Sequence, residues 1–185
     1  CCSSKSPQIM IQLLTLLIPL LALFRQAQAS SEYLRPQIHL TPEHGWLNDP
    51  NGLFYDRKEK LWHAYYQHNP DHSAVWTNQL VWGHSTSKDL LAWKYEKPAI
   101  EPEHKDEGIF SGSIVIDKKN TSGFFNDSVD PEHRIVAIYT NSVPKYQTQN
   151  VAYSVDGGYS FTKYDQNPVI NVTSPNQRDP KVFWH

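Results

Sequence analysis

The feature that most constrains the fold of this 185-residue chain is a series of short runs rich in β-branched and aromatic residues. Gly, Pro, Asn and Asp separate the runs, and no long segment after Ser30 has a helical hydrophobic period. This pattern predicts an all-β domain. The expected strands cover residues 52–55, 61–67, 80–85, 109–116, 135–140, 150–154, 160–164 and 181–184.

A weak internal repeat favours one kind of all-β fold. Residues 87–93 and 154–161 both contain Ser-x-Asp, followed by a turn and an aromatic residue. A carboxylate at the head of a turn can accept backbone N–H groups while the aromatic caps the hairpin, and such a device can recur in every blade of a β-propeller. The alternative is two unrelated hairpins with ordinary turn residues.

The N-terminal region has the three parts of a secretory signal peptide. An apolar run over residues 9–24 follows Lys5 and precedes a small-x-small site that ends at Ala29. A transmembrane anchor is the alternative, but the run is shorter than the roughly 20 apolar residues that a bilayer requires. We therefore predict a signal peptide over residues 1–29 and a mature chain from Ser30 with no membrane association.

Secretion affects the interpretation of two other residue types. Cleavage after Ala29 removes Cys1 and Cys2, so disulfides are not expected to stabilise the domain. Asn-x-Ser/Thr triplets begin at Asn120, Asn126 and Asn171, and in a secreted chain these are predicted glycan acceptors. Residues 118–132, which contain the first two triplets, are expected to form an exposed loop.

Charge and histidine content exclude two kinds of ligand. The 17 basic and 19 acidic side chains nearly balance, so no electropositive surface for nucleic acid is expected. The nine histidines invite a metal hypothesis, but the spacing of His63, His68 and His72 does not gather ligands on one face of a strand. No Cys or carboxylate cluster completes a site either, so we expect no metal and no cofactor.

The first candidate for chemistry is Trp-Leu-Asn-Asp-Pro-Asn-Gly at residues 46–52. A turn explains much of this string, because Asp before Pro favours extended backbone and Asn-Gly is a favoured turn pair. It does not explain why Trp46 and several short polar side chains crowd where a strand is expected to begin. That is the usual place for site residues on a rigid β scaffold.

A second Asp-Pro pair follows Arg178, where Asp179 and Pro180 precede another apolar run. A structural ion pair is the alternative, although adjacent side chains in a strand point to opposite faces. Two carboxylates, each held extended by a following Pro at the start of a strand, predict a shared carboxylate site.

Six motifs in order resemble glycoside hydrolase family 32, the invertases, β-fructofuranosidases and exo-inulinases. They lie at residues 35–40, 46–52, 66–70, 82–84, 110–113 and 178–180. The resemblance implies a five-bladed β-propeller with the active site in its central funnel, followed by a C-terminal β-sandwich. Residues 30–185 are then an incomplete N-terminal catalytic propeller, about its first half. The chain is expected to be an N-terminal fragment of a secreted fungal-type member, found outside the cell or in the cell wall.

The resemblance also implies the reaction, which is hydrolysis of terminal β-D-fructofuranosyl residues of sucrose or fructans with retention. Asp49 matches the nucleophile, and Asp179 matches the carboxylate that stabilises the transition state. Positions that line the fructosyl pocket fall on Asn48, Gln67, Trp76, Phe110, Ser111 and Arg178. Leu47 replaces a Met of similar volume, which leaves the site credible.

The general acid/base of the family is a Glu well downstream of Asp179, and no Glu follows Asp179 in this sequence. Glu101, Glu103 and Glu107 match no acid/base motif and are expected to face solvent.

Other functions remain as alternatives. An exo-inulinase or a fructosyltransferase of the same family differs from an invertase in the outer part of the pocket. Loss of Asp49 or Asp179 would favour a non-catalytic sugar-binding propeller, but both residues are present. A sialidase requires a cluster of three arginines, whereas those of the mature segment are spread along it. The expected partners are sucrose or inulin-type fructans, and the sequence leaves homo-oligomerisation open.

Overall fold

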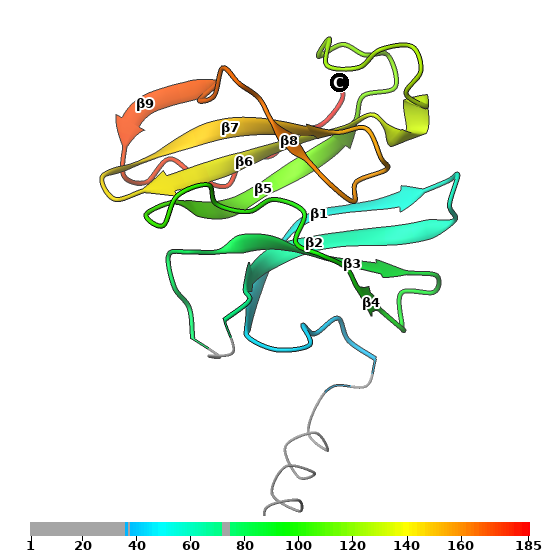
Figure 1. The fold of residues 1–185 in the computed structure, drawn as a ribbon, viewed down its shortest axis with the longest axis horizontal. Helices are drawn as coiled ribbons and strands as arrows, with labels where there is room; N and C mark the ends of the chain where they lie inside the picture. The colour runs from blue at the N-terminus through cyan, green and yellow to red at the C-terminus, as the bar shows by residue number, and fades with distance from the viewer. Residues whose placement is uncertain (1–35, 37, 72–74) are drawn as a thin grey trace, which may run out of the picture. The chain divides into compact units, whose positions relative to one another are not determined.

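The computed structural model describes residues 36, 38–71 and 75–185. Residues 38–185 form one compact unit made of two antiparallel sheets, which confirms the predicted all-β class (Figure 1). The expected signal peptide and both cysteines lie outside the described residues. Within the described ranges, no helix has the length and apolar character that crossing a bilayer requires.

The first sheet contains four strands in chain order. These are β1 (Trp46–Asp56), β2 (Leu61–Asn69), β3 (Val81–Ser87) and β4 (Lys94–Tyr95). A short turn joins β1 to β2 because Asp56 Oδ1 accepts the backbone N–H groups of Lys58 at 2.8 Å and Glu59 at 3.0 Å. Such a local bond is a common reason for Asp at the head of a turn.

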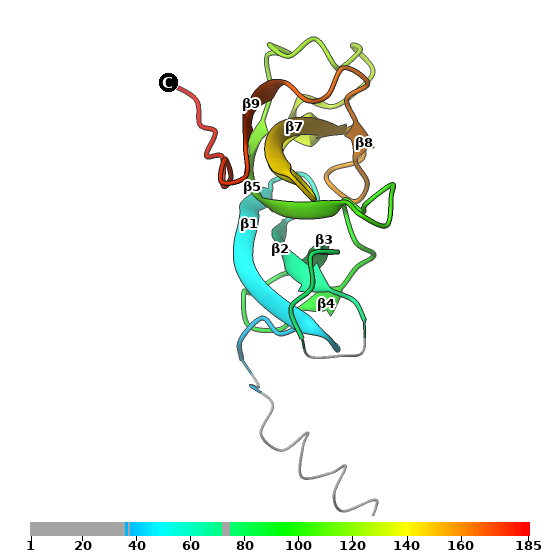
Figure 2. The same cartoon turned by 90° about the vertical axis from the view of Figure 1, so that its left-hand side faces the viewer.

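The second sheet repeats this up-and-down order. It contains β5 (Gly108–Ile116), β6 (Ile135–Val143), β7 (Tyr146–Ser154), β8 (Thr162–Lys163) and β9 (Ile170–Ser174), and both β8 and β9 pair with β7. A 3₁₀ helix, η1 (Pro131–His133), lies in the connection from β5 to β6. The first strands of the two sheets, β1 and β5, contact each other (Figure 2).

The repeated Ser-x-Asp motif occupies the same place in both sheets. In the connection from β3 to β4, Asp89 Oδ1 accepts the N–H groups two and three residues further along, both at 2.9 Å. In the connection from β7 to β8, Asp156 Oδ1 accepts those three and four residues further along, at 3.0 and 3.1 Å. The predicted carboxylate-headed turn is therefore confirmed at both repeats.

One apolar core joins the two sheets. Its buried members are Phe54, Tyr65, Trp82, Ala99, Ile100, Ile109, Ile135, Ala137, Tyr139 and Ala152. On β6 the fully buried core residues Ile135, Ala137 and Tyr139 follow the period of two that directs one face of a strand inward. The residues between them point to the other face of the second sheet.

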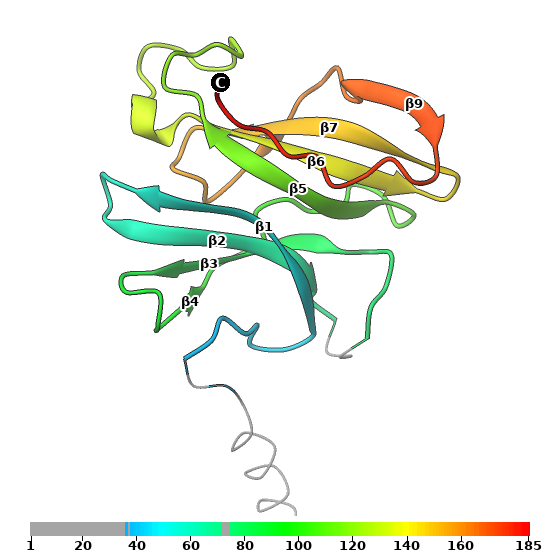
Figure 3. The same ribbon diagram turned by 180° about the vertical axis from the view of Figure 1, so that it is seen from behind.

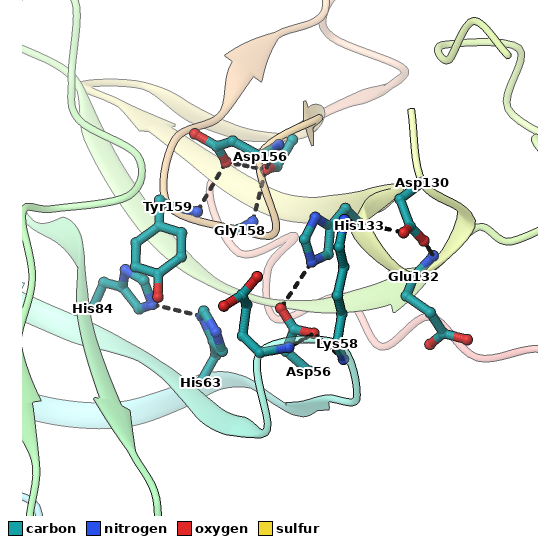
Figure 4. Close-up of polar contacts among 12 residues, drawn as sticks. Asp56, Lys58, His63, His84, Asp130, Glu132, His133, Asp156, Gly158 and Tyr159 are labelled. Carbon is teal, nitrogen blue, oxygen red and sulfur yellow. Dashed lines mark hydrogen bonds and ion pairs between the residues drawn. The ribbon is translucent and has the colours of Figure 1, made fainter. Parts of the chain in front are cut away.

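A polar cluster also joins the sheets, and we call it the histidine cluster (Asp56, His63, His84, His133 and Tyr159; Figure 4). Asp56, His63 and His84 are buried, His133 is half-buried and Tyr159 is exposed. His63 Nδ1 and His84 Nε2 lie 3.0 Å apart, while His133 Nε2 lies 3.0 Å from Asp56 Oδ2. The rings of His63 and His84 each make a T-shaped contact with the Tyr159 ring. Burial lowers the pKa of His63 to about 4 and that of His84 to about 3, so both are neutral near pH 7.

Two strand predictions are wrong. Residues 181–184 are not a strand, because none of the described residues supplies a strand that pairs with them. Instead, the N–H of Val182 donates to Ser113 Oγ at 2.8 Å and the indole of Trp184 donates to Ile116 O at 2.9 Å, so the segment follows β5 without a ladder (Figure 3). In addition, β1 begins at Trp46 rather than near residue 52, which places the first motif inside the strand.

Candidate active site

Asp49 lies in β1 where the pairing with β2 is interrupted. The register shifts between Leu47 and Pro50 and again between Pro50 and Gly52. Such irregularities leave residues unpaired and redirect their side chains, and Pro50 has no N–H to contribute to the ladder. The Asp49 side chain is consequently exposed although it belongs to a strand.

Ser111 of β5 holds the Asp49 carboxylate. Its hydroxyl donates to Asp49 Oδ2 at 2.7 Å, and Ser111 itself is only 8% exposed. The two strands can approach this closely because of Gly52, where a Cβ would lie 2.9 Å from Ile114 Cγ1. The glycine of the first motif therefore has a packing role that a turn does not explain.

A depression of about 430 Å³ brings the two predicted carboxylates to one site. Its lining consists of Asp49, Pro50, Asn51, Gly52, Leu53, Ser111, Gly112, Asp179, Pro180 and Lys181. Asp49 and Asp179, 130 positions apart in the sequence, thus line the same surface depression together with Ser111.

The backbone of Asp179 differs from the extended form that was predicted. Its φ is 64°, in the left-handed region that residues other than Gly and Asn or Asp seldom occupy. Arg178 Nε lies 3.9 Å from Asp179 Oδ2, so the expectation that strand alternation separates these side chains is also wrong. The segment is not a strand and the alternation does not apply. Both side chains are well exposed, so this ion pair adds little stability.

Gln67 lies beneath the depression rather than in its lining. It is 1% exposed, and its Nε2 donates to Ile109 O at 3.1 Å. In the amide orientation that matches the surrounding donors, Asn51 Oδ1 accepts from Gln67 Nε2 at 2.9 Å and from the Trp82 indole at 3.1 Å. Asn51 is therefore a site residue that the sequence interpretation missed, because its position before Gly52 was explained as a turn.

The remaining predicted pocket residues lie outside the lining of the depression. Asn48 Oδ1 accepts from the Trp46 indole at 2.7 Å. Trp76, which is 48% exposed, contacts Phe110 edge to face with ring centroids 6.2 Å apart. Arg178 is exposed and donates to Gln147 Oε1 at 3.3 Å.

Glu107 does not face solvent as expected. It is 7% exposed, and its Oε2 accepts the N–H of Glu103 at 2.5 Å and lies 3.4 Å from Lys163 Nζ. The expectation holds for Glu101 and Glu103, which are exposed. Among the described residues, no group of three or more His, Cys, Asp or Glu side chains is arranged to hold a metal ion.

The three predicted glycan acceptors differ in their surroundings. Asn126 is exposed, and its Oδ1 accepts from Ser128 N at 3.0 Å and from Ser128 Oγ at 2.5 Å. Asn120 is half-buried, and its side chain both donates to Phe125 O at 2.6 Å and accepts from Phe125 N at 3.0 Å. Asn171 is exposed on β9.

Comparison with known proteins gives one family. A protein-family model described as "Glycosyl hydrolases family 32 N-terminal domain" matches residues 39–185. An invertase of Wickerhamomyces anomalus is 68% identical over 178 residues, which are 95% of this chain and 32% of the relative. An extracellular exo-inulinase of Meyerozyma guilliermondii is 60% identical over 83% of this chain and 30% of its own length.

Solved structures agree with this result. A fructofuranosidase from Schwanniomyces occidentalis complexed with fructose superposes with a TM-score of 0.81 at 64% identity, over 84% of this chain and 30% of that one. The chain spans about a third of the length of the curated relatives it matches. It belongs to glycosyl hydrolases family 32.

Proposed function

We propose that this chain forms the N-terminal part of a retaining β-fructofuranosidase that releases terminal β-D-fructofuranosyl residues from sucrose, fructans or both. The observation that carries the proposal is the depression lined by Asp49, Ser111 and Asp179. The relatives named invertase and exo-inulinase, and the fructofuranosidase solved with fructose, support this substrate class.

In the proposed reaction, Asp49 attacks the anomeric carbon and forms a covalent fructosyl intermediate. The bond from Ser111 occupies Asp49 Oδ2, which leaves Oδ1 as the oxygen that attacks. Asp179 binds hydroxyl groups of the sugar and stabilises the positive charge that develops in the ring. Protonation of the leaving group is assigned to a Glu located beyond residue 185, about 5 Å from the nucleophile in the folded enzyme.

The other predicted residues complete the pocket in this proposal. Trp76 and Phe110 offer aromatic faces on which a sugar can pack, while Asn48 and Arg178 supply polar groups at its margin. Gln67 contributes by supporting Asn51, because its Nε2 donates to Asn51 Oδ1 when the Asn51 amide is oriented to match its neighbours. The pocket takes a sugar substrate and requires no cofactor.

We further propose that the two sheets are the first two blades of a five-bladed propeller that a β-sandwich follows. Their repeated strand order and matching Ser-x-Asp turns support this assignment, as does the roughly threefold greater length of the relatives. Residues 1–29 are assigned as a signal peptide, and Asn120, Asn126 and Asn171 as glycan acceptors. The relative named extracellular exo-inulinase supports secretion.

The test is product analysis of the full-length protein. Incubation with sucrose and with inulin, followed by NMR of the first product, should show β-fructose, and a fructosyl trapping reagent should label the peptide that contains Asp49. Transfer products in place of free fructose would assign a fructosyltransferase. Sugar binding without any cleavage would instead indicate a binding module, and an inverted first product would contradict the role of Asp49.

A further inference from the structure

The face of the second sheet opposite the core carries a row of buried polar side chains. Thr140 is 0% exposed, Gln149 4% and Ser113 1%, although none of them points toward the apolar core. Thr140 and Gln149 are directly paired across β6 and β7, and Ser113 pairs with Ile138, two residues before Thr140 on the same face. Some other part of the chain must therefore cover this face.

The covering element is the segment of residues 177–182, which crosses the face of β5 and β6 that is turned toward the viewer in Figure 3. The N–H of Asp179 donates to Thr140 Oγ1 at 3.0 Å. The Thr140 hydroxyl in turn donates to Gln149 Oε1 at 3.2 Å, and Gln149 Nε2 donates to Gln177 O at 2.8 Å. Thr140 and Gln149 thus hold the backbone on both sides of Arg178.

Ser113 holds the same segment beyond Asp179. Its hydroxyl donates to Pro180 O at 2.9 Å and accepts the N–H of Val182 at 2.8 Å. These side chains replace the ladder that the segment lacks. They also surround a residue whose left-handed backbone needs external support, because both its φ and its position before Pro are unfavourable.

We infer that Thr140, supported by Gln149, is a positioning residue that holds the Asp179 carboxylate at the depression it shares with Asp49. This inference rests on the proposed function and assigns no contact between Thr140 and the sugar. No recognisable sequence motif marks Thr140 or Gln149 for this role.

The experiment compares Thr140→Val with Thr140→Ser in the full-length protein. Val keeps the volume and removes the hydroxyl, so kcat on sucrose should fall about 10- to 100-fold while KM changes less than about threefold. Ser keeps the hydroxyl and should retain most of the activity. Thr148→Val is the matched control, because Thr148 is also buried on this hairpin but its hydroxyl donates to Asn150 Oδ1 rather than to the segment.

A double-mutant cycle separates positioning from general stability. In an Asp179→Asn background, Thr140→Val should lower kcat little further, because the group it positions is already lost. Fully additive losses, or a kcat for Thr140→Val equal to that of the wild type, would overturn the inference.

Amide hydrogen exchange gives a readout that does not depend on turnover. The Asp179 amide should exchange about tenfold faster in Thr140→Val than in the wild type or in Thr148→Val. If the wild type cleaves no fructoside, the proposed function fails, and this exchange still decides whether Thr140 holds the segment. Unchanged exchange at Asp179 would refute it.

Discussion

The depression and the histidine cluster are two polar regions of the same pair of sheets, and they are built in opposite ways. His63 and His84 sit in regular strands, opposite Thr86 and Tyr65 in an unbroken register, and both are buried. Asp49 and Asp179 lie where the ladder is broken or absent, and both are exposed.

This difference separates polar groups that join sheets from polar groups that can meet a ligand. A buried polar group in a regular strand can find a partner only inside the protein, as His63 Nδ1 and His84 Nε2 do with each other. Where the backbone is irregular, a carboxylate does not follow the alternation of a strand, and its side chain can point to the surface. The first arrangement serves stability, and the second leaves the group available for chemistry.

The largest effect that the comparison predicts is the loss of turnover in Asp49→Asn. Asn has nearly the same shape as Asp and can still accept from Ser111, but it is a very poor nucleophile. We expect kcat on sucrose to fall by at least about 10⁴-fold, with KM within about threefold of the wild type. Steady-state kinetics of the full-length enzyme test this, and turnover near the wild-type rate would remove Asp49 from the reaction.

A smaller effect is expected for Asp179→Asn, because in the proposed mechanism this residue stabilises charge without forming a covalent bond. We expect kcat/KM to fall about 10²- to 10³-fold, while trapping at Asp49 still proceeds slowly. Mass spectrometry of the trapped enzyme measures this second property. A label that moves to another residue would show that the two carboxylates have been assigned the wrong way round.

The histidine cluster is expected to affect acid stability rather than turnover. In the folded protein the pKa of His63 is about 4 and that of His84 about 3, whereas a His side chain in the unfolded chain has a pKa near 6.5. In acid the unfolded chain therefore binds more protons than the folded protein. The stability contributed by the neutral pair is complete above about pH 6.5. It declines as the pH falls to about 4 for His63 and about 3 for His84, by up to about 1.4 kcal/mol per pH unit for each.

The variant that tests this replaces both residues, as His63→Gln with His84→Gln, because two amides can keep one hydrogen bond without titrating. Denaturant unfolding between pH 7 and pH 4 should show a shallower loss of stability than in the wild type. His104→Gln, at an exposed position, is the control. Equal slopes for wild type and double variant would contradict the assignment.

The sequence predicted more of the fold than of the site. Short apolar runs and turn residues located most strands, since they report local preferences and alternation. The strand at 181–184 failed because pairing depends on a partner that local sequence does not reveal. The Asp-Pro pairs predicted that the two carboxylates share one site, and both residues line the same depression. For Asp179, however, the predicted extended backbone was wrong.

What the sequence could not indicate is how distant residues support the site. Thr140, Gln149 and Ser113 look like ordinary strand residues, and they matter only because residues 177–182 fold over them. Asn51 was not predicted as a site residue for a different reason, because the Asn-Gly pair could be explained fully as a turn. Long-range contacts of this kind become visible in the structure alone.

The smallest expected effects concern the glycan acceptors, where the same contrast between held and exposed polar groups applies. Asn126 lies in an exposed turn, whereas Asn120 is half-buried and bonded at both amide atoms to the backbone of Phe125. Folding of this loop withdraws the Asn120 amide from a transferase. We therefore expect occupancy to be higher at Asn126 than at Asn120.

Peptide mapping of the secreted protein before and after deglycosylation measures the two occupancies directly. Asn126→Gln should remove the mass of one glycan and leave kcat unchanged, because its loop lies outside the depression lined by Asp49 and Asp179. Asn120→Gln should change the glycan mass less but lower the unfolding temperature slightly, since it disturbs the paired bonds to Phe125. Full occupancy at Asn120 with none at Asn126 would show that modification precedes folding of this loop, and that the geometry of the folded chain does not select the acceptor.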